Sequence, residues 1–385
     1  MAVLFFLPWT SVAEELRIAG MRLIPYARGR LPGELMGISQ QVLDSVLGNY
    51  GDRGRGAQPA QPIHRAAFLL WRDDAPGLEV SDSQIQQRLV EGSYFAFSAM
   101  ASRRLCSTFE YYNSDTLQIV AQRFDAHSPA HSCITTRRRD GGTQNMLAGG
   151  GGLKFIRPYH VDNSARISVD VPLLEALLRL PDGELKQRID EAIVAFLRAN
   201  TDATSMDERS ELILMRIAFD TLLAASHDKP AFRRAVTAHF DEVPNPPIWH
   251  KGSLGEATWR EHWNSPIGRP LDAWVHDFSA ARNAAAHASN TTQKGSLWPR
   301  HNHLLFASWL LPLIVKKLLA HEGLYELSDE DKVARAGFEV FLAHDLLALA
   351  DKKSEILGWQ KAEAELFLPL FAERRKRPPN TPCVS

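Results

Sequence analysis

The sequence is poor in cysteine and has almost no net charge. Its three cysteines, Cys106, Cys133 and Cys383, are odd in number and widely spaced, which excludes a disulfide framework and paired-cysteine metal sites. We therefore expect a cytoplasmic protein in a reducing compartment. The formal net charge is -1, so bulk charge does not mark a nucleic-acid-binding protein, and any contact with RNA would depend on a local basic patch.

Long apolar runs and leader features are also missing. The most apolar stretch, LLFASWLLPLIVKKLL, is interrupted by Pro312 and ends in Lys316 and Lys317, so we expect no membrane span. The apolar start, MAVLFFLPW, lacks a basic region and predicts a first β-strand rather than a signal peptide. The four glycines at 149–152 are not followed by Lys-Ser or Lys-Thr, which excludes a phosphate-binding P-loop.

What the chain does have is a change of pattern near residue 170. Before it, strand-length aromatic or β-branched runs alternate with turn formers; from Pro172 onward, apolar residues recur every three or four positions. A chain of 385 residues also favours two domains. We therefore predict an α+β fold. A mixed α/β domain over 1–170, with a possible sensory or regulatory role, precedes an all-helical bundle over 171–385 with a basic C-terminal tail.

The same patterns predict individual elements. In the first domain, strands are expected at 3–9, 21–27, 66–72, 94–100, 107–113 and 117–124, and helices at 31–48 and 81–92, the second capped by Ser81. The segment 125–152 is typical of a long polar loop or a hairpin. In the second domain, helices are expected near 172–180, 182–200, 206–226, 230–240, 255–263, 270–288, 299–321, 329–350 and 353–376.

Polar residues interrupt the alanine-rich segment FSAARNAAAHASN at 278–290. Helical geometry predicts that this helix buries one apolar face, made of Leu271, Trp274, Val275, Phe278, Ala281 and Ala285. Arg282 lies within about 40° of the middle of that face, where a guanidinium needs an acidic partner or a cleft that admits an anion. His287 would point about 140° away from Arg282, so the helix must end or bend near Ala286, or a second subunit must complete the site.

Arginine, an amide and histidine can together cleave RNA without a metal. His287 can accept or donate a proton near neutral pH, and Arg282 can neutralise charge on the phosphoryl oxygens. The amide of Asn283 can hold the imidazole tautomer or a phosphate oxygen. This chemistry requires no cofactor.

The stretch RNAAAH, from Arg282 to His287, resembles the Arg-x4-6-His motif of the HEPN superfamily, which often begins with Arg-Asn. An aromatic-bearing helix precedes it, and the long apolar segment HNHLLFASWLLPLIVKKLL follows it. Upstream, DERSELILMRIAFDTLLAAS resembles the early helix of HEPN domains, with Asp220 near the position of an acidic residue that is more often glutamate. The resemblance covers residues 172–350 and does not extend to the N-terminal domain.

The resemblance implies a helical bundle that forms a homodimer, so that two motifs share a composite active site. It also implies metal-independent endoribonuclease activity, frequently as a toxin or in defence against phage. Carried over by position, Arg282 would stabilise the phosphate and His287 would be the acid/base group. Asn283 would orient the reacting groups, and Asp220 would have a supporting role in the site. An antitoxin or a phage-derived trigger would be the regulatory partner. The alternative is a non-catalytic HEPN-like module for dimerisation or for binding protein or RNA.

The sequence contains its own control for this motif. Arg234 and His239 have the same spacing as Arg282 and His287, but Arg233 adjoins them on a short basic amphipathic stretch, which predicts a solvated face. Spacing alone therefore does not identify the site.

Other candidate residues favour simpler interpretations. His127, His131 and Cys133 could suggest zinc, but a fourth ligand is missing nearby, which leaves a zinc enzyme as a weaker third hypothesis. His301 and His303 are expected at the surface where a helix begins. The six tryptophans between 249 and 309 predict a helical core rather than a stacking surface for bases.

Overall fold

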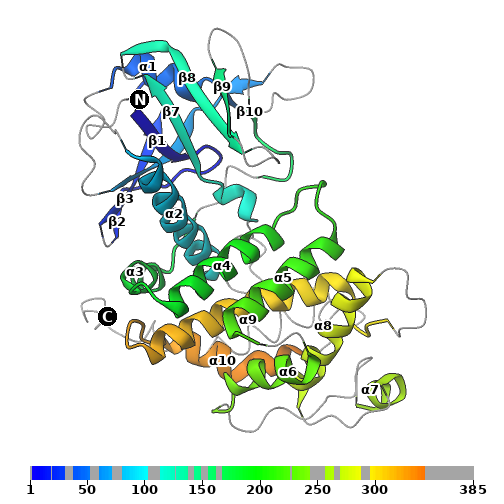
Figure 1. Ribbon diagram of the computed structural model, residues 1–385. Coiled ribbons are helices and arrows are strands. Elements are labelled where there is room, and N and C mark those ends of the chain that lie inside the picture. Colours follow the sequence, from blue (N-terminus) through cyan, green and yellow to red (C-terminus); the bar gives the residue numbers. More distant parts are fainter. Residues whose placement is uncertain are drawn as a thin grey trace, which may run out of the picture. The chain divides into compact units, whose positions relative to one another are not determined.

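The computed structural model describes residues 2–18, 20–30, 38–52, 60–71, 80–102, 113–125, 127–137, 143–148, 155–161, 167–225, 228–242, 256–263, 269–287 and 295–342. The chain divides into two compact units: residues 1–103, 108–178 and 200–205 form the first, and residues 104–107, 179–199 and 206–385 form the second. The sheets belong to the first unit and most helices to the second, so the fold is α+β, as predicted (Figure 1).

The first unit is built on an antiparallel sheet. Among the described residues it has seven strands in the order β2-β3-β6-β1-β7-β8-β9. Their bounds are β1 Ala2–Leu7, β2 Leu16–Ile18, β3 Met21–Ala27, β6 Arg65–Trp71, β7 Val120–Asp125, β8 Ser128–Arg137 and β9 Thr143–Ala148. The central strand, β1, is buried throughout and pairs Phe5 with Leu69 of β6 and with Ala121 of β7. A smaller sheet joins β10 (Phe155–Ile156), β4 (Tyr50–Asp52) and β5 (Gln61–Pro62).

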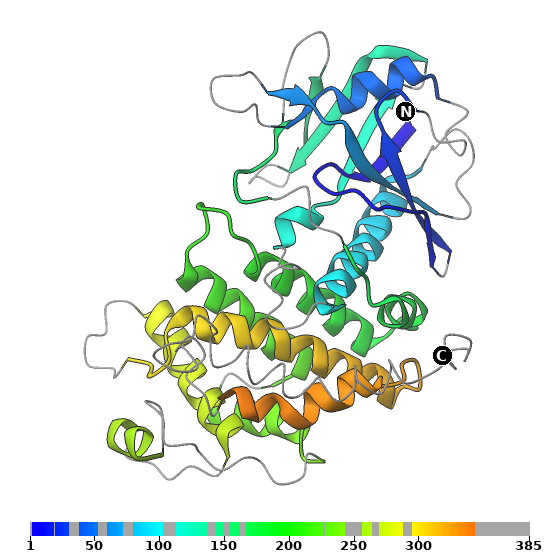
Figure 2. The ribbon, with the colours of Figure 1, turned by 180° about the vertical axis from the view of Figure 1, so that it is seen from behind.

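Two helices cover the two faces of the larger sheet. Alternate side chains of a strand point to opposite faces. Leu4 and Phe6 therefore share one apolar cluster with α1 (Gln40–Leu47). Phe5 points the other way, where the guanidinium of Arg88, on α2 (Asp82–Ser102), lies 5.5 Å from the centre of its ring. The sheet therefore lies between α1 and α2, which pack on its opposite faces (Figure 2).

Helix α2 confirms one prediction and overturns another. Ser81 caps it reciprocally with Gln84, since the Gln84 amide donates to Ser81 Oγ at 3.3 Å and the Ser81 amide donates to Gln84 Oε1 at 2.8 Å. The strand predicted at 94–100 is wrong, because α2 continues through it to Ser102. Tyr94, Phe95 and Phe97 are all buried there, and an apolar run buried on every side carries no period that distinguishes helix from strand.

The remaining predictions for the first unit have mixed outcomes. The segment 125–152 was predicted to be either a long polar loop or a hairpin. It contains the antiparallel hairpin β8–β9, which agrees with the second interpretation. The helix predicted at 31–48 is confirmed only as α1, which begins at Gln40, and residues 31–37 lie outside the described ones. Most of the strand predicted at 107–113 also lies outside them.

The helices predicted after residue 170 are confirmed to within a turn at each described end. They are α3 Val171–Arg179, α4 Glu184–Ala199, α5 Glu208–Leu223, α6 Lys229–Ala238, α7 Glu256–Trp263, α8 Pro270–Ala286, α9 Arg300–His321 and α10 Asp329–Leu342. Helix α3 belongs to the first unit as far as Leu178. Residues 343–350 and the helix predicted at 353–376 lie outside the described residues.

Helix α5 occupies the middle of the second unit, in contact with α4, α8 and α9. Phe219 of α5 packs edge-on against Trp274 and Phe278 of α8, which stack on each other at 5.0 Å. The predicted apolar face of α8 is buried at every one of its six positions. The core interpretation of the tryptophans holds for Trp259, Trp274 and Trp298, which are buried.

Helix α9 is long and apolar enough to cross a membrane by length and composition alone. However, 67% of its most apolar window is buried inside the protein. That burial is typical of the core helix of a soluble protein, and α9 lies beside α5 in both ribbon views (Figures 1 and 2).

Candidate functional site

Helix α8 ends between the arginine and the histidine of the Arg-x4-His motif, as predicted from the sequence. Its last residue is Ala286, and His287 is the C-cap, with φ -120° and ψ 54°. The His287 amide still donates to the Asn283 carbonyl at 2.9 Å. The side chain of His287 is exposed. The predicted helix end is therefore confirmed, and it places the imidazole in solvent at the edge of the bundle.

Arg282, one turn earlier, is half-buried instead. Its Nη1 donates to Asn283 Oδ1 at 3.2 Å, and its Nε is buried without a hydrogen-bond partner. Within the described residues Arg282 forms no ion pair. A guanidinium cannot lose its proton, so this partly desolvated charge is left uncompensated.

A second arginine lies beside it, and sequence reasoning missed it. Arg216 of α5 is buried; its Nε binds Asp220 Oδ1 at 2.8 Å and its Nη1 donates to Ser279 Oγ of α8 at 3.0 Å. Burial lowers the pKa of Arg216, Asp220 opposes that change, and the positive charge of Arg282 lowers the pKa further. Ser279, which Arg216 contacts, lies three residues before Arg282 on α8, so the two arginines approach the same side of that helix. The signal that was available is the i,i+4 spacing of Arg216 and Asp220 in the mainly apolar part of α5 that follows Glu211.

The structure thus brings part of the predicted site together. Asp220 and Arg282 both act on Arg216, the first through an ion pair and the second through its charge. Asn283 contacts Arg282 directly. His287 leaves the helix on an exposed turn, and in a single chain it has no described contact with these three side chains. The arrangement can hold an anion at Arg282, with an exposed imidazole at the helix end.

The segment that leads into α9 is fixed by a buried carboxylate, Asp277 of α8. Asp277 accepts hydrogen bonds from the amides of Leu297 and Trp298, both at 2.9 Å, and from Trp263 Nε1 at 3.0 Å. His303 Nε2 lies 3.1 Å from the same carboxylate. The surface position predicted for His303 is wrong, because its ring is fully buried against Asp277, whereas His301 is exposed as predicted.

The control pair has the opposite arrangement. Arg234 is exposed, in agreement with the solvated face that was predicted. His239 is half-buried at the C-cap of α6, so the prediction is wrong for this residue. Burial, together with the nearby charge of Arg335, lowers the pKa of His239 to about 4. This imidazole is therefore neutral at physiological pH and cannot serve as a general acid there.

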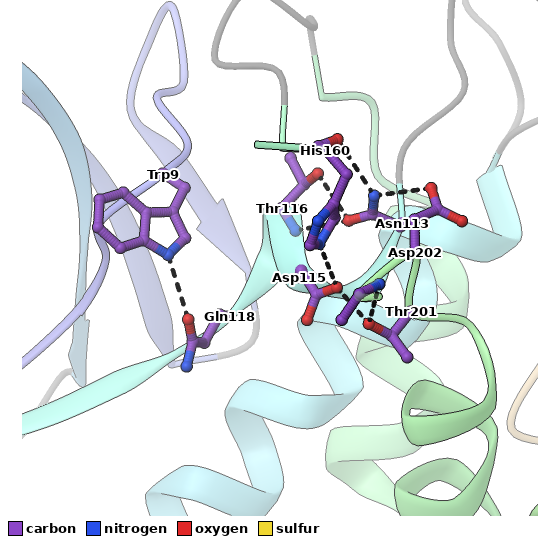
Figure 3. Close-up of polar contacts among 9 residues, drawn as sticks. Trp9, Asn113, Asp115, Thr116, Gln118, His160, Thr201 and Asp202 are labelled. Carbon is purple, nitrogen blue, oxygen red and sulfur yellow. Dashed lines mark hydrogen bonds and ion pairs between the residues drawn. The ribbon is translucent and has the colours of Figure 1, made fainter. Parts of the chain in front are cut away.

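A separate polar cluster lies in the first unit and was not predicted (Figure 3). Asp115 sits in a short 3-10 helix, Ser114–Leu117, and its Oδ2 lies 2.8 Å from His160 Nε2. Thr201 Oγ1 donates to the same carboxylate oxygen. Asn113 donates to Asp202 Oδ2 at 2.8 Å. These contacts join chain segments that are far apart in the sequence, so no local pattern could have revealed them.

The geometry of this cluster favours a structural role. The Thr201 hydroxyl gives its proton to Asp115 rather than to His160, so it is not aligned as a nucleophile with the imidazole as its base. Its oxygen also accepts the amide of Ala203 at 3.1 Å. The groups drawn in Figure 3 satisfy one another, in contrast to Arg282.

The histidine and cysteine residues proposed for zinc lie at the β7–β8 turn and along β8. His127 is exposed just before the strand, and His131 and Cys133 are two residues apart on it. The side chains of β8 lie outside the described ones. Among the side chains that are described, no three His, Cys, Asp or Glu residues group closely enough to hold a metal ion.

Arg282, Asn283, His287 and Asp220, with the newly found Arg216, form the candidate site of the helical unit. In this site the cations outnumber the carboxylates that the structure shows bonded to them. Comparisons of the chain with protein-family models, with curated proteins and with solved structures found no match.

Proposed function

We propose that the chain is a metal-independent endoribonuclease of the HEPN type. The observation that carries this proposal is the state of Arg282: half-buried, next to a second guanidinium, and with a buried Nε that lacks a partner. A phosphodiester supplies the missing negative charge and hydrogen-bond acceptors. Such a site favours the pentacoordinate phosphorus of the transition state, on which negative charge accumulates.

The residues divide the chemistry between them. The 2′-hydroxyl of a nucleotide attacks the adjacent phosphorus, a cyclic 2′,3′-phosphate forms, and the 5′-oxygen of the next nucleotide leaves. His287 takes the hydroxyl proton or protonates the leaving oxygen, which its exposed position at the end of α8 allows. Asn283 orients the Arg282 guanidinium, and Asp220 supports the site through Arg216.

The active form is a homodimer. Arg282 turns inward and His287 outward, so one chain does not present both to one phosphate. A second copy supplies the missing histidine and also gives the reaction its acid and its base. The enzyme acts in the cytoplasm as a toxin or an anti-phage effector, and the N-terminal domain responds to an antitoxin or a phage-derived trigger.

The proposal is tested by incubating the purified protein with total RNA in EDTA, beside Arg282→Ala and His287→Ala. We expect cleavage that survives chelation and falls by on the order of 100-fold or more in each variant, as for loss of one transition-state contact. The products should carry cyclic phosphate ends. Intact RNA under every condition, with a stable dimer retained, would contradict the proposal and support the non-catalytic module.

A further inference from the structure

Four aromatic rings gather where α7 meets α8. Trp259 and Trp263 of α7 both contact His276 of α8, and their ring centres lie 5.5 Å and 4.7 Å from the centre of the imidazole. His262 lies edge-on against Trp263 at 4.7 Å. Trp259 is buried, whereas the other three rings are half-buried and keep part of their surface in solvent. We call these three half-buried rings, His262, Trp263 and His276, the α7–α8 aromatic cluster.

Hydrogen bonds fix two rings of this cluster in place. Trp263 Nε1 donates to Oδ1 of the buried Asp277 at 3.0 Å, and His262 Nε2 lies 2.7 Å from the carbonyl oxygen of Gly295. A ring whose orientation is already fixed loses little conformational entropy when a second flat ring stacks on it. The cluster is therefore preorganised for stacking.

The third ring, His276, is neutral and lies near exposed cations. Burial lowers the pKa of His276, and the charge of Lys229 lowers it further against the opposing charge of Asp277, so the imidazole is uncharged at physiological pH. Arg233 of α6 is exposed, and its Nε lies 3.9 Å from Oδ1 of Asp272, one helical turn before His276. A flat apolar surface beside exposed cations is the combination that binds single-stranded nucleic acids, because bases stack on the rings and phosphates bind the cations.

The cluster lies on the same side of α8 as Asn283 of the candidate site. Seven residues turn an α-helix by about 700°, so His276 and Asn283 differ by only about 20° in direction and lie about 10 Å apart along the helix axis. Asn283 accepts a hydrogen bond from Arg282. Two consecutive nucleotides of an extended strand cover the distance from a phosphate at Arg282 to a base at His276.

We propose that the α7–α8 aromatic cluster is a stacking subsite for one nucleobase of a single-stranded RNA. The base stacks on Trp263 and His276, close to the phosphate bound at Arg282, and Arg233 receives a flanking phosphate. This inference rests on the proposed function for its substrate. It adds that the substrate is unpaired at this position, because both faces of a base within a duplex are covered by its neighbours.

The test compares two fluorescein-labelled single strands of equal length and equal charge. One is oligodeoxythymidine, and the other is the same sugar–phosphate chain without bases. Neither has a 2′-hydroxyl, so the proposed reaction cleaves neither of them. The Kd of each strand for the full-length protein is measured by fluorescence anisotropy. We expect the wild type to bind the strand with bases on the order of tenfold more tightly, as for one or two stacked bases.

Substitutions at Trp263 separate stacking from the hydrogen bond to Asp277. Trp263→Leu removes the ring and should reduce the preference for bases to within about twofold, whereas Trp263→Phe loses only the hydrogen bond and should keep most of the preference. His276→Leu and His276→Phe form a second pair with the same expectation. Tyr159→Leu removes an aromatic side chain that is 85% exposed in the first unit, and it should leave the preference unchanged. Rings that only pack α7 against α8 would give no preference for bases in any of these proteins.

A crosslink locates the base without any substitution. Thymine is replaced by 5-iodouracil, which on irradiation forms a covalent adduct with an aromatic side chain stacked on it. We expect adducts on Trp263 or His276, identified by mass spectrometry of the digested complex.

Equal affinity of the wild type for the two strands, or no binding of either, would overturn the proposal. A full preference for bases in Trp263→Leu, or adducts confined to other segments, would do the same. Melting temperatures show which variants fold, and if Trp263→Leu does not, the His276 pair and the wild-type crosslink decide. Cleavage of an all-RNA strand is recorded in parallel. A preference for bases without cleavage supports the subsite and refutes the nuclease, whereas cleavage without a preference refutes only the subsite.

Discussion

Two Arg-x4-His pairs lie at the ends of two helices of the same unit, and the burial of their two side chains is reversed between them. In both, the histidine is the C-cap, of α6 for His239 and of α8 for His287. At α6 the arginine is exposed and the histidine half-buried; at α8 the arginine is half-buried and the histidine exposed. The same spacing thus gives two arrangements. At α6 a solvated arginine precedes a neutral, half-buried histidine, and at α8 a partly desolvated arginine precedes an exposed histidine.

The difference shows what the spacing leaves open. Only the α8 pair combines an unpaired, partly desolvated guanidinium with an imidazole that solvent and substrate can reach. At α6, the depressed pKa of about 4 keeps His239 neutral, and its carbonyl is occupied by Arg335. The environment of each side chain, rather than the motif, separates a candidate site from a helix end.

The largest expected effect is on RNA cleavage. Arg282→Ala should reduce the cleavage rate by on the order of 100-fold, whereas Arg234→Ala should leave it within about twofold, because the side chain of Arg234 is exposed to solvent. Single-turnover cleavage of a labelled RNA measures both. Equal losses in the two variants would show that general basic charge, and not the α8 pair, drives the reaction.

An effect of intermediate size is expected on stability in acid. The folded-state pKa of His239, about 4, lies below its ordinary value of 6.5, so the neutral ring contributes stability above pH 6.5 that is lost as the pH falls towards 4. Between pH 7 and pH 5 this loss should be about 1–2 kcal/mol. Urea unfolding should show a smaller loss in His239→Gln over that range. His287→Gln retains His239 and serves as the matched control; an equal reduction in it would contradict the assignment.

The smallest effect is a gain of stability. Arg282→Gln removes the repulsion with Arg216 and the partly buried unpaired charge, so it should raise the free energy of unfolding by about 0.5–1 kcal/mol. Arg234→Gln, on the exposed side chain, should change it by less than about 0.5 kcal/mol. Thermal denaturation compares the two. Destabilisation by Arg282→Gln would mean that Arg282 has a structural partner and is not held ready for an anion.

The helices could be predicted because their faces repeat along the sequence. The burial of the α8 face and its end at Ala286 follow from helical period and loop composition. The reciprocal cap of Ser81 with Gln84 is equally local. The strand expected at 94–100 failed because α2 is buried around Tyr94, Phe95 and Phe97, which erases the period.

The site could be predicted only in part. Arg282, Asn283 and His287 lie within six residues of one another, so they could be singled out together from the sequence, although only Arg282 and Asn283 are in contact. The fully buried pairing of His303 with Asp277 joins two helices, and nothing near His303 in the sequence indicates it. The contact between Arg216 and Ser279 likewise depends on how α5 packs against α8. Whether a buried polar side chain has a hydrogen-bond partner depends on segments far away in the sequence, and local patterns do not show those segments.

The Asp277 carboxylate has a consequence for how the two longest described helices of the second unit can move. From within α8 it accepts hydrogen bonds from the amides of Leu297 and Trp298, and His303 Nε2 of α9 lies 3.1 Å from it. A buried carboxylate that loses its donors costs about 1–3 kcal/mol for each group left unsatisfied. Any displacement of α9 against α8 would have to break these hydrogen bonds together, so we expect the two helices to move as one rigid body.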